Sequence, residues 1–338
     1  KMTQNGQTLT FTDDDYLLGL YNANKDRAYQ MPIIDLVTKV NGDSITAPNQ
    51  FATKYVYADG TGNTTINVSS NKVQVHTYNP TTHKDVELGS NVHGDTDASV
   101  TGQEVAEGTI VTWPMTTSDL PANRAQDIVT HTEVDNLTPD LQYMGYTAWL
   151  PGANGQLQDV TAHVKLTQNG QKLTFTDDDY LLKLYNSNKG QAFKMPIIDV
   201  VTKTTGNTQL LPNAFDTQFV YDDGNGDTTI NVHSNQPNVS TYDPTDHKDV
   251  EIGGSVQGDP AGTINGKLIA EGTVVTWPMS TSDLVANRAQ DVVSHVTNET
   301  LNGNLRVLGY HAYLPGANGQ LQDVTSHVQM TQNGQKLT

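Results

Sequence analysis

The sequence contains no cysteine, and this absence excludes disulfide bonds, thiol catalysis and thiolate metal sites. Any covalent reinforcement of the fold must therefore use other side chains. Cationic residues are also scarce, since 19 Lys and Arg oppose 37 Asp and Glu and leave a formal net charge of −18. Nucleic acids and anionic membranes bind clustered cations, so neither is an expected partner. No hydrophobic run approaches the length of a membrane span, and membrane insertion is not expected.

What the chain has in place of these features is repetition. The stretch TQNGQTLT begins at Thr3, and TQNGQKLT begins at Thr167 and again at Thr331, which gives one fixed period of 164 residues. The motifs MPIID, HKDVE and VTWPM recur in the same register without a gap. Solenoid repeats are only about 20 to 50 residues long, so a period of this length indicates whole domains in tandem.

Most segments of each repeat are typical of β-strands. Short β-branched or aromatic runs alternate with Asn, Gly, Pro and Asp, for example at 108–115, 142–150, 218–223 and 228–234. These runs predict a β-sandwich. The exception is TDDDYLLKLYNSN at 176–188, where we expect Thr176 to cap a short helix, three aspartates to fill its first turn, and Leu181, Leu182, Leu184 and Tyr185 to form its apolar face.

The triple aspartates at 13–15 and 177–179 are the most acidic clusters. Helix capping is the favoured interpretation, surface calcium is an alternative, and catalysis is the least favoured because one run on one turn cannot flank a scissile bond. The histidine pairs 83 and 247, 131 and 295, and 163 and 327 lack metal-helix spacing, so we expect them to be solvated or packed. No metal site and no cofactor are predicted, with Ca²⁺ left open.

A different starting point for the period makes a family resemblance visible. Read from Lys84 to Pro244, the chain contains KDVEL, TSDLPANR, VDNL, NAF and SN in that order. This arrangement resembles the C-terminal domains of the antigen I/II family of Gram-positive cell-wall adhesins. The resemblance implies a mainly β fold of tandem elaborated immunoglobulin-like (Greek-key) β-sandwiches with one short inserted helix per repeat. It also implies an extracellular location, at the cell surface or anchored to the cell wall.

The same resemblance implies a covalent cross-link. In that family an intramolecular isopeptide bond joins a first-strand lysine to a last-strand asparagine with the help of an acidic residue. Position by position, Lys84 matches the lysine, Asn213 the asparagine and Asp135 the acid. The runner-up acids are Asp119 and its counterpart Asp283.

The residue types suit this chemistry. Only a neutral amine attacks a carboxamide, and burial lowers a lysine pKa because the charged form loses its hydration. A protonated carboxyl group can polarise the asparagine carbonyl and pass a proton to departing ammonia. The competing interpretations are that Lys84 is an exposed strand residue and that Asn213 is a turn residue after Pro212.

The period also predicts three domains. Residues 81–244 form a complete repeat, 1–80 the C-terminal half of one, and 245–338 the N-terminal half of the next. The first part contains Asn49 without an upstream lysine, and the last contains Lys248 and the acid Glu299 without a downstream asparagine. We expect these halves to complete each other head-to-tail between neighbouring copies, or within a longer continuous repeat. Lys248 should then lie beside Asn49 of a neighbour, in an open filament rather than a closed dimer.

Three functions are compatible with these features. The leading one is a structural stalk or fibre module of a surface adhesin, cross-linked by itself and not an enzyme with turnover. The second is a ligand-binding adhesin domain that recognises host glycoprotein or carbohydrate through Trp113, Trp149 and acidic loops. The third, a polysaccharide or cell-wall hydrolase, is disfavoured because the sequence shows no convergent polar cluster of the kind an active site needs.

Overall fold

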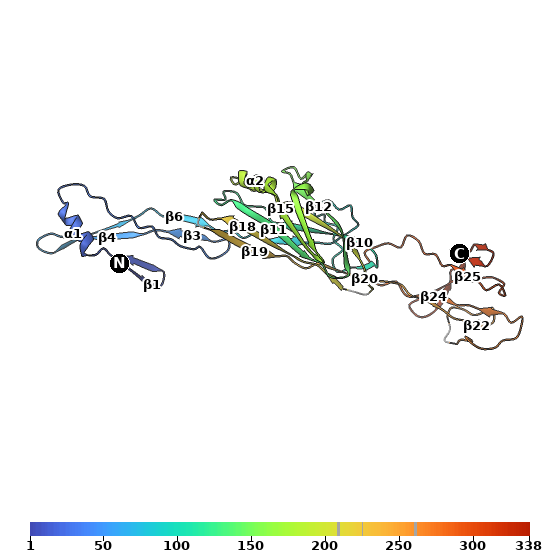
Figure 1. The fold of residues 1–338 in the computed structure, drawn as a ribbon. Coiled ribbons are helices and arrows are strands. Elements are labelled where there is room, and N and C mark those ends of the chain that lie inside the picture. The colour runs from blue at the N-terminus through green and yellow to red at the C-terminus, as the bar shows by residue number, and fades with distance from the viewer. Residues whose placement is uncertain (208–209, 225, 260–261) are drawn as a thin grey trace. The chain divides into compact units, whose positions relative to one another are not determined.

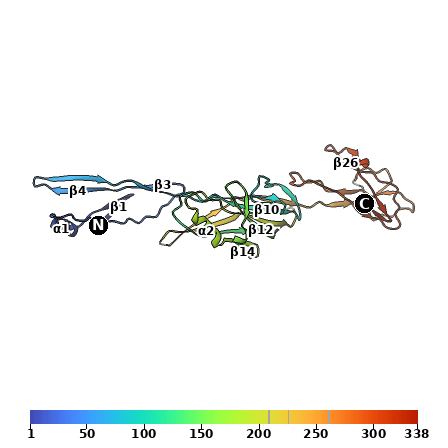
Figure 2. The same ribbon diagram turned by 90° about the horizontal axis from the view of Figure 1, so that it is seen from above.

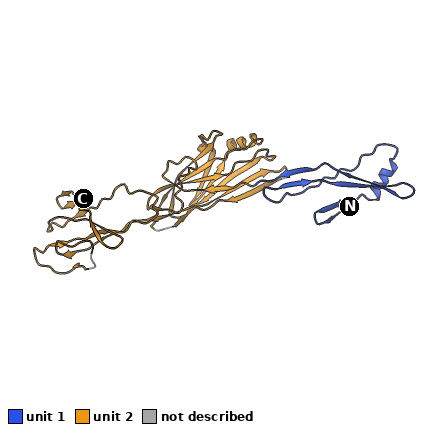
Figure 3. Cartoon of the chain, turned by 180° about the vertical axis from the view of Figure 1, so that it is seen from behind, with its two compact units in different colours: residues 1–78 blue, residues 79–338 orange. Residues whose placement is uncertain are grey.

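The computed structural model describes residues 1–207, 210–224, 226–259 and 262–338. The chain forms two compact units, residues 1–78 and 79–338 (Figure 3). The boundary between the units lies two residues before the predicted one at 80/81, whereas the predicted boundary at 244/245 falls inside the second unit. The division into three repeat domains therefore stays a prediction. Neither α-helix of the described part is long and apolar enough to cross a lipid bilayer.

The second unit contains a sandwich of two mostly antiparallel sheets (Figure 1). The first sheet has the order β13-β12-β16-β10-β7, and β8 also pairs with β10; the second has the order β14-β15-β11-β18-β19. The strands of the first sheet are β7 (Thr82–Lys84), β8 (Glu87–Leu88), β10 (Ile110–Thr117), β12 (Leu141–Pro151), β13 (Leu157–Asp159) and β16 (Ile197–Thr204). Those of the second are β11 (Ile128–Asn136), β14 (Val164–Asn169), β15 (Lys172–Asp177), β18 (Phe215–Asp222) and β19 (Asp227–His233).

The second unit also contains a third, smaller sheet. Its order is β17 (Leu210–Pro212), β20 (Asn238–Tyr242) and β9 (Glu104–Ala106). The pair β20 and β9 is parallel, whereas β17 and β20 are antiparallel. The last strand of the repeat is therefore hydrogen-bonded to a strand near its beginning.

Alternation of apolar and polar residues explains why the two large sheets face each other. On β18, Phe215, Thr217, Phe219 and Tyr221 are buried, and the residues between them are exposed or half-buried. Successive side chains of a strand point to opposite faces, so this alternation places one face against the other sheet. Trp113 and its neighbours on β10, in the other sheet, are buried as well. The predicted mainly β fold is confirmed.

The helix α2 (Asp179–Ser187) follows β15 and packs against β11 and β15 (Figures 1 and 2). Its cap is Asp178, whose carboxylate accepts hydrogen bonds from the main-chain N–H groups of Tyr180 and Leu181. The predicted cap, Thr176, is wrong because strand pairing with β11 and β14 extends β15 through Asp177. Only one aspartate therefore remains in the first turn. Of the expected apolar face, Leu181 and Tyr185 are buried.

The first unit consists of two-stranded antiparallel pairs and one helix. The pairs are β1 with β2, β3 with β6, and β4 with β5. None of its described residues is buried, and Ile33 and Val37 are each 90% exposed. The elements are β1 (Met2–Asn5), β2 (Thr8–Phe11), α1 (Asp15–Ala23), β3 (Thr46–Asn49), β4 (Ala52–Ala58), β5 (Asn63–Ser69) and β6 (Val73–His76).

Residues 245–338 also form short pairs with little burial. Among the described residues of this segment, only Pro278 is buried. The strands are β21 (Asp246–Lys248), β22 (Glu251–Ile252), β23 (Val275–Thr276), β24 (Met279–Thr281), β25 (Glu299–Thr300), β26 (Tyr313–Pro315), β27 (Leu321–Asp323), β28 (Gln332–Asn333) and β29 (Lys336–Leu337). The 3₁₀ turns η1 (Thr161–His163) and η2 (Thr325–His327) occupy equivalent places in successive repeats.

Candidate functional site: a buried lysine, carboxylate and asparagine

Lys84 is the last residue of β7, where it pairs with Met115 of β10. Its side chain is completely buried, with the centroids of the Trp113 and Phe215 rings 5.9 and 5.8 Å from Nζ. Lysine is almost never fully buried without a partner. Full burial therefore contradicts the interpretation of Lys84 as an exposed strand residue.

The partner of Lys84 comes from the opposite sheet. Asp135 on β11 is also completely buried, and its Oδ2 lies 2.6 Å from Lys84 Nζ. Asn213 is 1% exposed, and its Nδ2 donates to the same carboxylate oxygen at 3.3 Å. Because Asp135 pairs with Phe215 across the β11–β18 ladder, the acid lies beside the residues that precede β18. The structure thus brings together the three residues predicted to form the cross-link.

One detail differs from the arrangement that the resemblance implies. Asn213 does not lie on the last strand but in the link between β17 and β18, so that β18, β19 and β20 all follow it. The family pattern of first and last strands therefore applies to Lys84 but not to Asn213.

Burial controls the protonation of this cluster. It lowers the pKa of Lys84 because the ammonium loses its hydration, and the neighbouring carboxylate of Asp135 opposes this shift. Two oxygens of the cluster, Asp135 Oδ1 and Asn213 Oδ1, are buried and accept no hydrogen bond from any described residue. A buried acceptor without a donor costs about 1 to 3 kcal/mol, and the cluster has two such acceptors.

Asn235 holds the main chain of Lys84 in place. Its Oδ1 accepts from the Lys84 N–H at 2.7 Å, and its Nδ2 donates to the Lys84 carbonyl at 2.8 Å. The adjacent Ser234 is joined to Phe215 by two hydrogen bonds of 2.9 and 3.0 Å. The SN motif was part of the family resemblance, but the sequence analysis gave it no role. In the structure it ties the lysine strand to the strand after Asn213.

A second buried network lies on the same strand, and the sequence analysis missed it. His131, Glu133 and Asp135 alternate on β11 and all face the interior. His131 Nδ1 lies 2.8 Å from Asp177 Oδ2, which also accepts from the hydroxyl of Tyr185 at 2.5 Å. Burial opposes protonation of His131, but Asp177 outweighs it and raises the pKa of His131. In the sequence these three ionisable residues are spaced two apart, a pattern that places side chains on one face of a strand.

Glu133 lies between this network and the lysine cluster. Its Oε1 accepts from the Thr117 hydroxyl at 3.0 Å, and Oε2 has no partner among the described residues. Burial raises the pKa of Glu133 to about 7, although His131 opposes the shift. The neutral carboxylic acid is therefore the main form of Glu133 below neutral pH.

Several other residues singled out in the sequence lie elsewhere. Asp119 forms a half-exposed ion pair with Lys194 at 2.9 Å, outside the cluster, and Asp283 is exposed. Trp113 is fully buried and donates to Thr202 Oγ1 at 2.9 Å. Its assignment to a surface ligand-binding site is therefore wrong. Trp149 is half-buried against the ring of His93, at 4.4 Å between centroids.

The repeat that begins at 245 contains a looser version of the cluster. Lys248 and Glu299 form an ion pair, with side chains 40% and 19% exposed. The Lys248 Nζ lies 5.4 Å from the centroid of the Trp277 ring, as Lys84 lies over Trp113. Asn49, at the end of β3 in the first unit, is exposed.

A small set of side chains could hold a metal ion. His247, Asp249 and Asp259 each place one ligand atom within 4.8 Å of the others. The sequence analysis did not single out the two aspartates. By contrast, the carboxylates of the triple aspartate are used within the protein: Asp177 bonds to His131 and Tyr185, and Asp178 caps α2.

Comparisons with known proteins give structural similarities at low sequence identity. No protein-family model and no curated protein matches the chain. The C-terminal domain of the Streptococcus pyogenes antigen I/II-family protein AspA gives a TM-score of 0.41 at 18% identity, over 57% of this chain and 55% of that one. The C-terminal domain of the Streptococcus agalactiae antigen I/II polypeptide BspA gives 0.40 at 17%, over 57% and 59%. A C-terminal fragment of the Streptococcus agalactiae major pilin GBS80 gives 0.37 at 16%, over 63% and 82%.

The chain therefore spans little more than half of the antigen I/II structures that it matches. Two of these three structures are domains of antigen I/II proteins, the family that the sequence resembles.

Proposed function

We propose that residues 81–244 are a stalk or fibre module of an extracellular bacterial adhesin, and that a self-formed isopeptide bond between Lys84 and Asn213 stabilises it. The supporting observation is the burial of Lys84, Asn213 and Asp135 at one point between two sheets, with Lys84 and Asn213 both in contact with Asp135. The module turns over no substrate, because it consumes its own side chains once.

The reaction begins with a proton transfer. Moving one proton from Lys84 Nζ to Asp135 along the 2.6 Å contact leaves a neutral amine, which burial favours. The amine nitrogen attacks the Asn213 Cγ, the Nζ–Cγ bond forms and the Cγ–Nδ2 bond breaks. Asp135 gives a proton to the leaving nitrogen and takes one from the attacking nitrogen. The products are a secondary amide, ammonia and protonated Asp135.

The unpaired oxygen of Asn213 supports a second role for the acid. A half-turn of the carboxamide would exchange Nδ2 and Oδ1 and bring the unpaired Oδ1 to Asp135 Oδ2, where Nδ2 now lies at 3.3 Å. Once Asp135 carries a proton, it can donate to that oxygen and stabilise the negative charge that develops there during attack. The same proton would supply a donor to one of the two unpaired oxygens, Asn213 Oδ1.

Intact mass spectrometry tests the bond directly. Each isopeptide releases one ammonia, so the middle repeat should lower the mass by about 17 Da relative to the sequence. Asp135→Ala should restore the full mass while leaving the lysine and the asparagine in place. Asp119→Ala, which removes the runner-up acid, is the matched control and should keep the loss. A wild-type mass equal to the sequence sum would exclude the bond.

We further propose that copies of the chain associate head-to-tail, so that 245–338 of one copy and 1–80 of the next complete one repeat. Lys248 is already paired with Glu299, and Asn49 of the neighbour would supply the carboxamide. The many exposed apolar side chains of both segments support this pairing, because burial of apolar surface contributes about 25 cal/mol per Å². Oligomers that persist in denaturant, and that disappear in Lys248→Ala, are the expected result.

A further inference from the structure

Two consecutive repeats meet through one short loop in the second unit. The sequence NRAQ at 287–290 lies against the segment 102–109 of the middle repeat. The Glu104 N–H donates to the Asn287 carbonyl at 2.9 Å, and the Ala289 N–H donates to the Glu104 carbonyl at 2.8 Å. These two bonds form a parallel bridge, so the loop adds itself to the edge of β9.

Two side chains of the loop complete the contact. Asn287 Nδ2 donates to the Gly102 carbonyl at 2.8 Å. Gln290 Oε1 accepts from the Ala106 N–H at 2.8 Å, and its Nε2 donates to the Thr109 hydroxyl at 3.1 Å. Asn287 has a φ of 58°, a left-handed conformation that asparagine tolerates better than most residues. The loop is thus a specific hydrogen-bonding unit.

The middle repeat carries an identical loop, NRAQ at 123–126, in the same conformation. Asn123 has a φ of 60°. The loop is held from behind by Arg124, which is buried and donates to the carbonyls of Pro121 and Tyr185, each at 2.7 Å. The geometry that Asn287 needs to bind a strand edge is therefore already present at Asn123.

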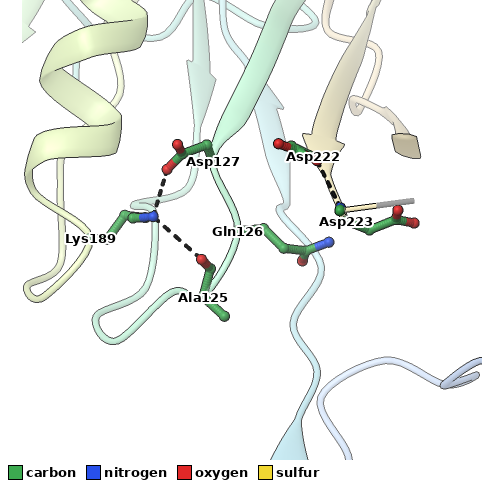
Figure 4. A pocket seen from close by; sticks show the side chains of 7 residues that line it. Ala125, Gln126, Asp127, Lys189, Asp222 and Asp223 are labelled. Atoms are coloured by element: carbon green, nitrogen blue, oxygen red, sulfur yellow. Dashed lines mark hydrogen bonds and ion pairs between the residues drawn. The ribbon is translucent and has the colours of Figure 1, made fainter. Parts of the chain in front are cut away.

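At 123–126, the groups equivalent to those that make the contact at 287–290 have no hydrogen bond within the described part of the chain. No group in the described part of the chain bonds the Asn123 carbonyl, the Ala125 N–H or the side-chain amide of Gln126. Figure 4 shows Gln126 beside an open pocket of about 380 Å³. Lys189 binds the carbonyl of Ala125 and the carboxylate of Asp127, neither of which the docked loop requires.

The segment that corresponds to the bound edge is also unused, and it forms no strand in the structure. The segment GKLIAEGT at 266–273 corresponds to GQEVAEGT at 102–109. Thr273 donates to the Ala270 carbonyl at 2.6 Å, as Thr109 does to Ala106 at the same distance, so the same turn is formed. The edge is open, since Leu268 is 102% exposed. The loop binds the side-chain hydroxyl of Thr109 on the edge at 102–109, and Thr273 supplies the equivalent hydroxyl at 266–273.

From these observations we propose that the loop 123–126 of one copy docks on the edge 266–273 of a second copy. In the contact within one chain, the loop at 287–290 belongs to the repeat that follows the one with the edge at 102–109. In the proposed head-to-tail association, the repeat that follows the edge at 266–273 is the middle repeat of a second copy, and its loop is at 123–126. This inference rests on the proposed head-to-tail association and adds a second, non-covalent contact to it. It makes Asn123 and Gln126 specificity residues of the contact between copies, although neither takes part in the cross-link.

Thiol cross-linking tests this contact cleanly because the chain has no cysteine. In a Lys248→Ala background, which prevents isopeptides between copies, we would introduce Ala125→Cys and Leu268→Cys, whose counterparts Ala289 and Glu104 bond through main-chain atoms, and add a short bismaleimide. A ladder of oligomers on a denaturing gel is the expected result. The matched control is Glu104→Cys with Ala289→Cys, the same pair of positions at the contact within one chain, which should cross-link without a ladder.

Absence of the ladder, with the control cross-linked, would overturn the docking. The mass loss of the middle repeat is measured on the same sample before the reagent is added, so failure of the docking and failure of the isopeptide are separate results. As a second measurement, Asn123→Gly with Gln126→Ala should weaken association about 10 to 100-fold in sedimentation, because three side-chain hydrogen bonds are lost. An unchanged association constant would also contradict the proposal.

Discussion

The octapeptide TQNGQKLT occurs twice in the second unit and folds to different extents in the two places. At 167–174 it lies within β14 and β15, six residues each, and Leu173 is fully buried. At 331–338 it forms β28 and β29, two residues each, and Leu337 is only half-buried. Both copies keep the same turn, with φ values of 59° at Gly170 and 61° at Gly334. The turn is thus a local property of the sequence, whereas strand length and burial depend on neighbouring strands.

The same comparison applies to the two lysines. Lys84 and Lys248 occupy equivalent positions, each beside an acid and a tryptophan, yet one side chain is fully buried and the other is 40% exposed. What differs is that the middle repeat also contains α2 and β16 to β20, and Phe215 of β18 places its ring over Lys84. Desolvation of the amine, which the proposed reaction needs, therefore comes from the second half of a repeat.

The largest expected effect comes from removing the buried lysine. Lys84→Ala should abolish the proposed bond across a loop of 129 residues, counted from 84 to 213, which by the chain-entropy relation would contribute roughly 5 kcal/mol. Calorimetry should show the Tm of the middle repeat falling by roughly 10 to 20 °C. Lys248→Ala is the matched control and should leave this transition in place. Equal Tm values for Lys84→Ala and the parent would show that no stabilising bond exists.

The next effect concerns pH. The pKa of Glu133 rises from 4.5 to about 7 on folding, so between these values the unfolded state binds fewer protons than the folded state, and stability falls as pH rises. The fall amounts to roughly 3 kcal/mol. Glu133→Gln should flatten denaturant-derived stability across this window, whereas the exposed Glu107→Gln should not. A slope unchanged by Glu133→Gln would mean that Glu133 ionises normally.

A smaller effect is expected at the clamp on the lysine main chain. Asn235→Ala removes two hydrogen bonds to Lys84 and should cost roughly 2 kcal/mol, and it should slow the loss of ammonia during refolding. Timed mass spectra measure that rate. The counterpart Asn71→Ala in the first unit leaves both quantities unchanged, so a slow reaction in both variants would point to a general folding defect.

The smallest effect separates the two helices. Asp178→Ala removes the cap of α2, whose Leu181 and Tyr185 are buried, and should cost about 1 kcal/mol and about 2 to 4 °C in Tm. Asp14→Ala removes the equivalent cap of α1, which has no buried residue. That change should leave the main transition where it is. Equal shifts would show that the caps act independently of burial.

These comparisons explain what the sequence could and could not predict. Strand alternation and the helix were readable because periodicity is a local property. The resemblance to antigen I/II domains pointed to Lys84, Asp135 and Asn213, and the structure places these three side chains together. The cap was misplaced because the pairing of Thr176 with β11 is a long-range contact. The role of Asn235 was not predicted because its partner Lys84 lies 151 residues away. The role of Glu133 was not predicted because it depends on burial between the two sheets.

The position of Asn213 ahead of three strands has a mechanical consequence. A bond to Lys84 would enclose residues 85–212 in a covalent ring, and a pulling force along the chain would bypass them. The residues 214–244, which carry β18, β19 and β20, would lie in series with the load. At about 3.3 Å per residue these 31 residues could lengthen to at most roughly 100 Å before the chain becomes taut. Under a pulling force, each repeat would therefore lengthen by a fixed increment and no further. A bond between the outermost strands would leave no such segment in series with the load.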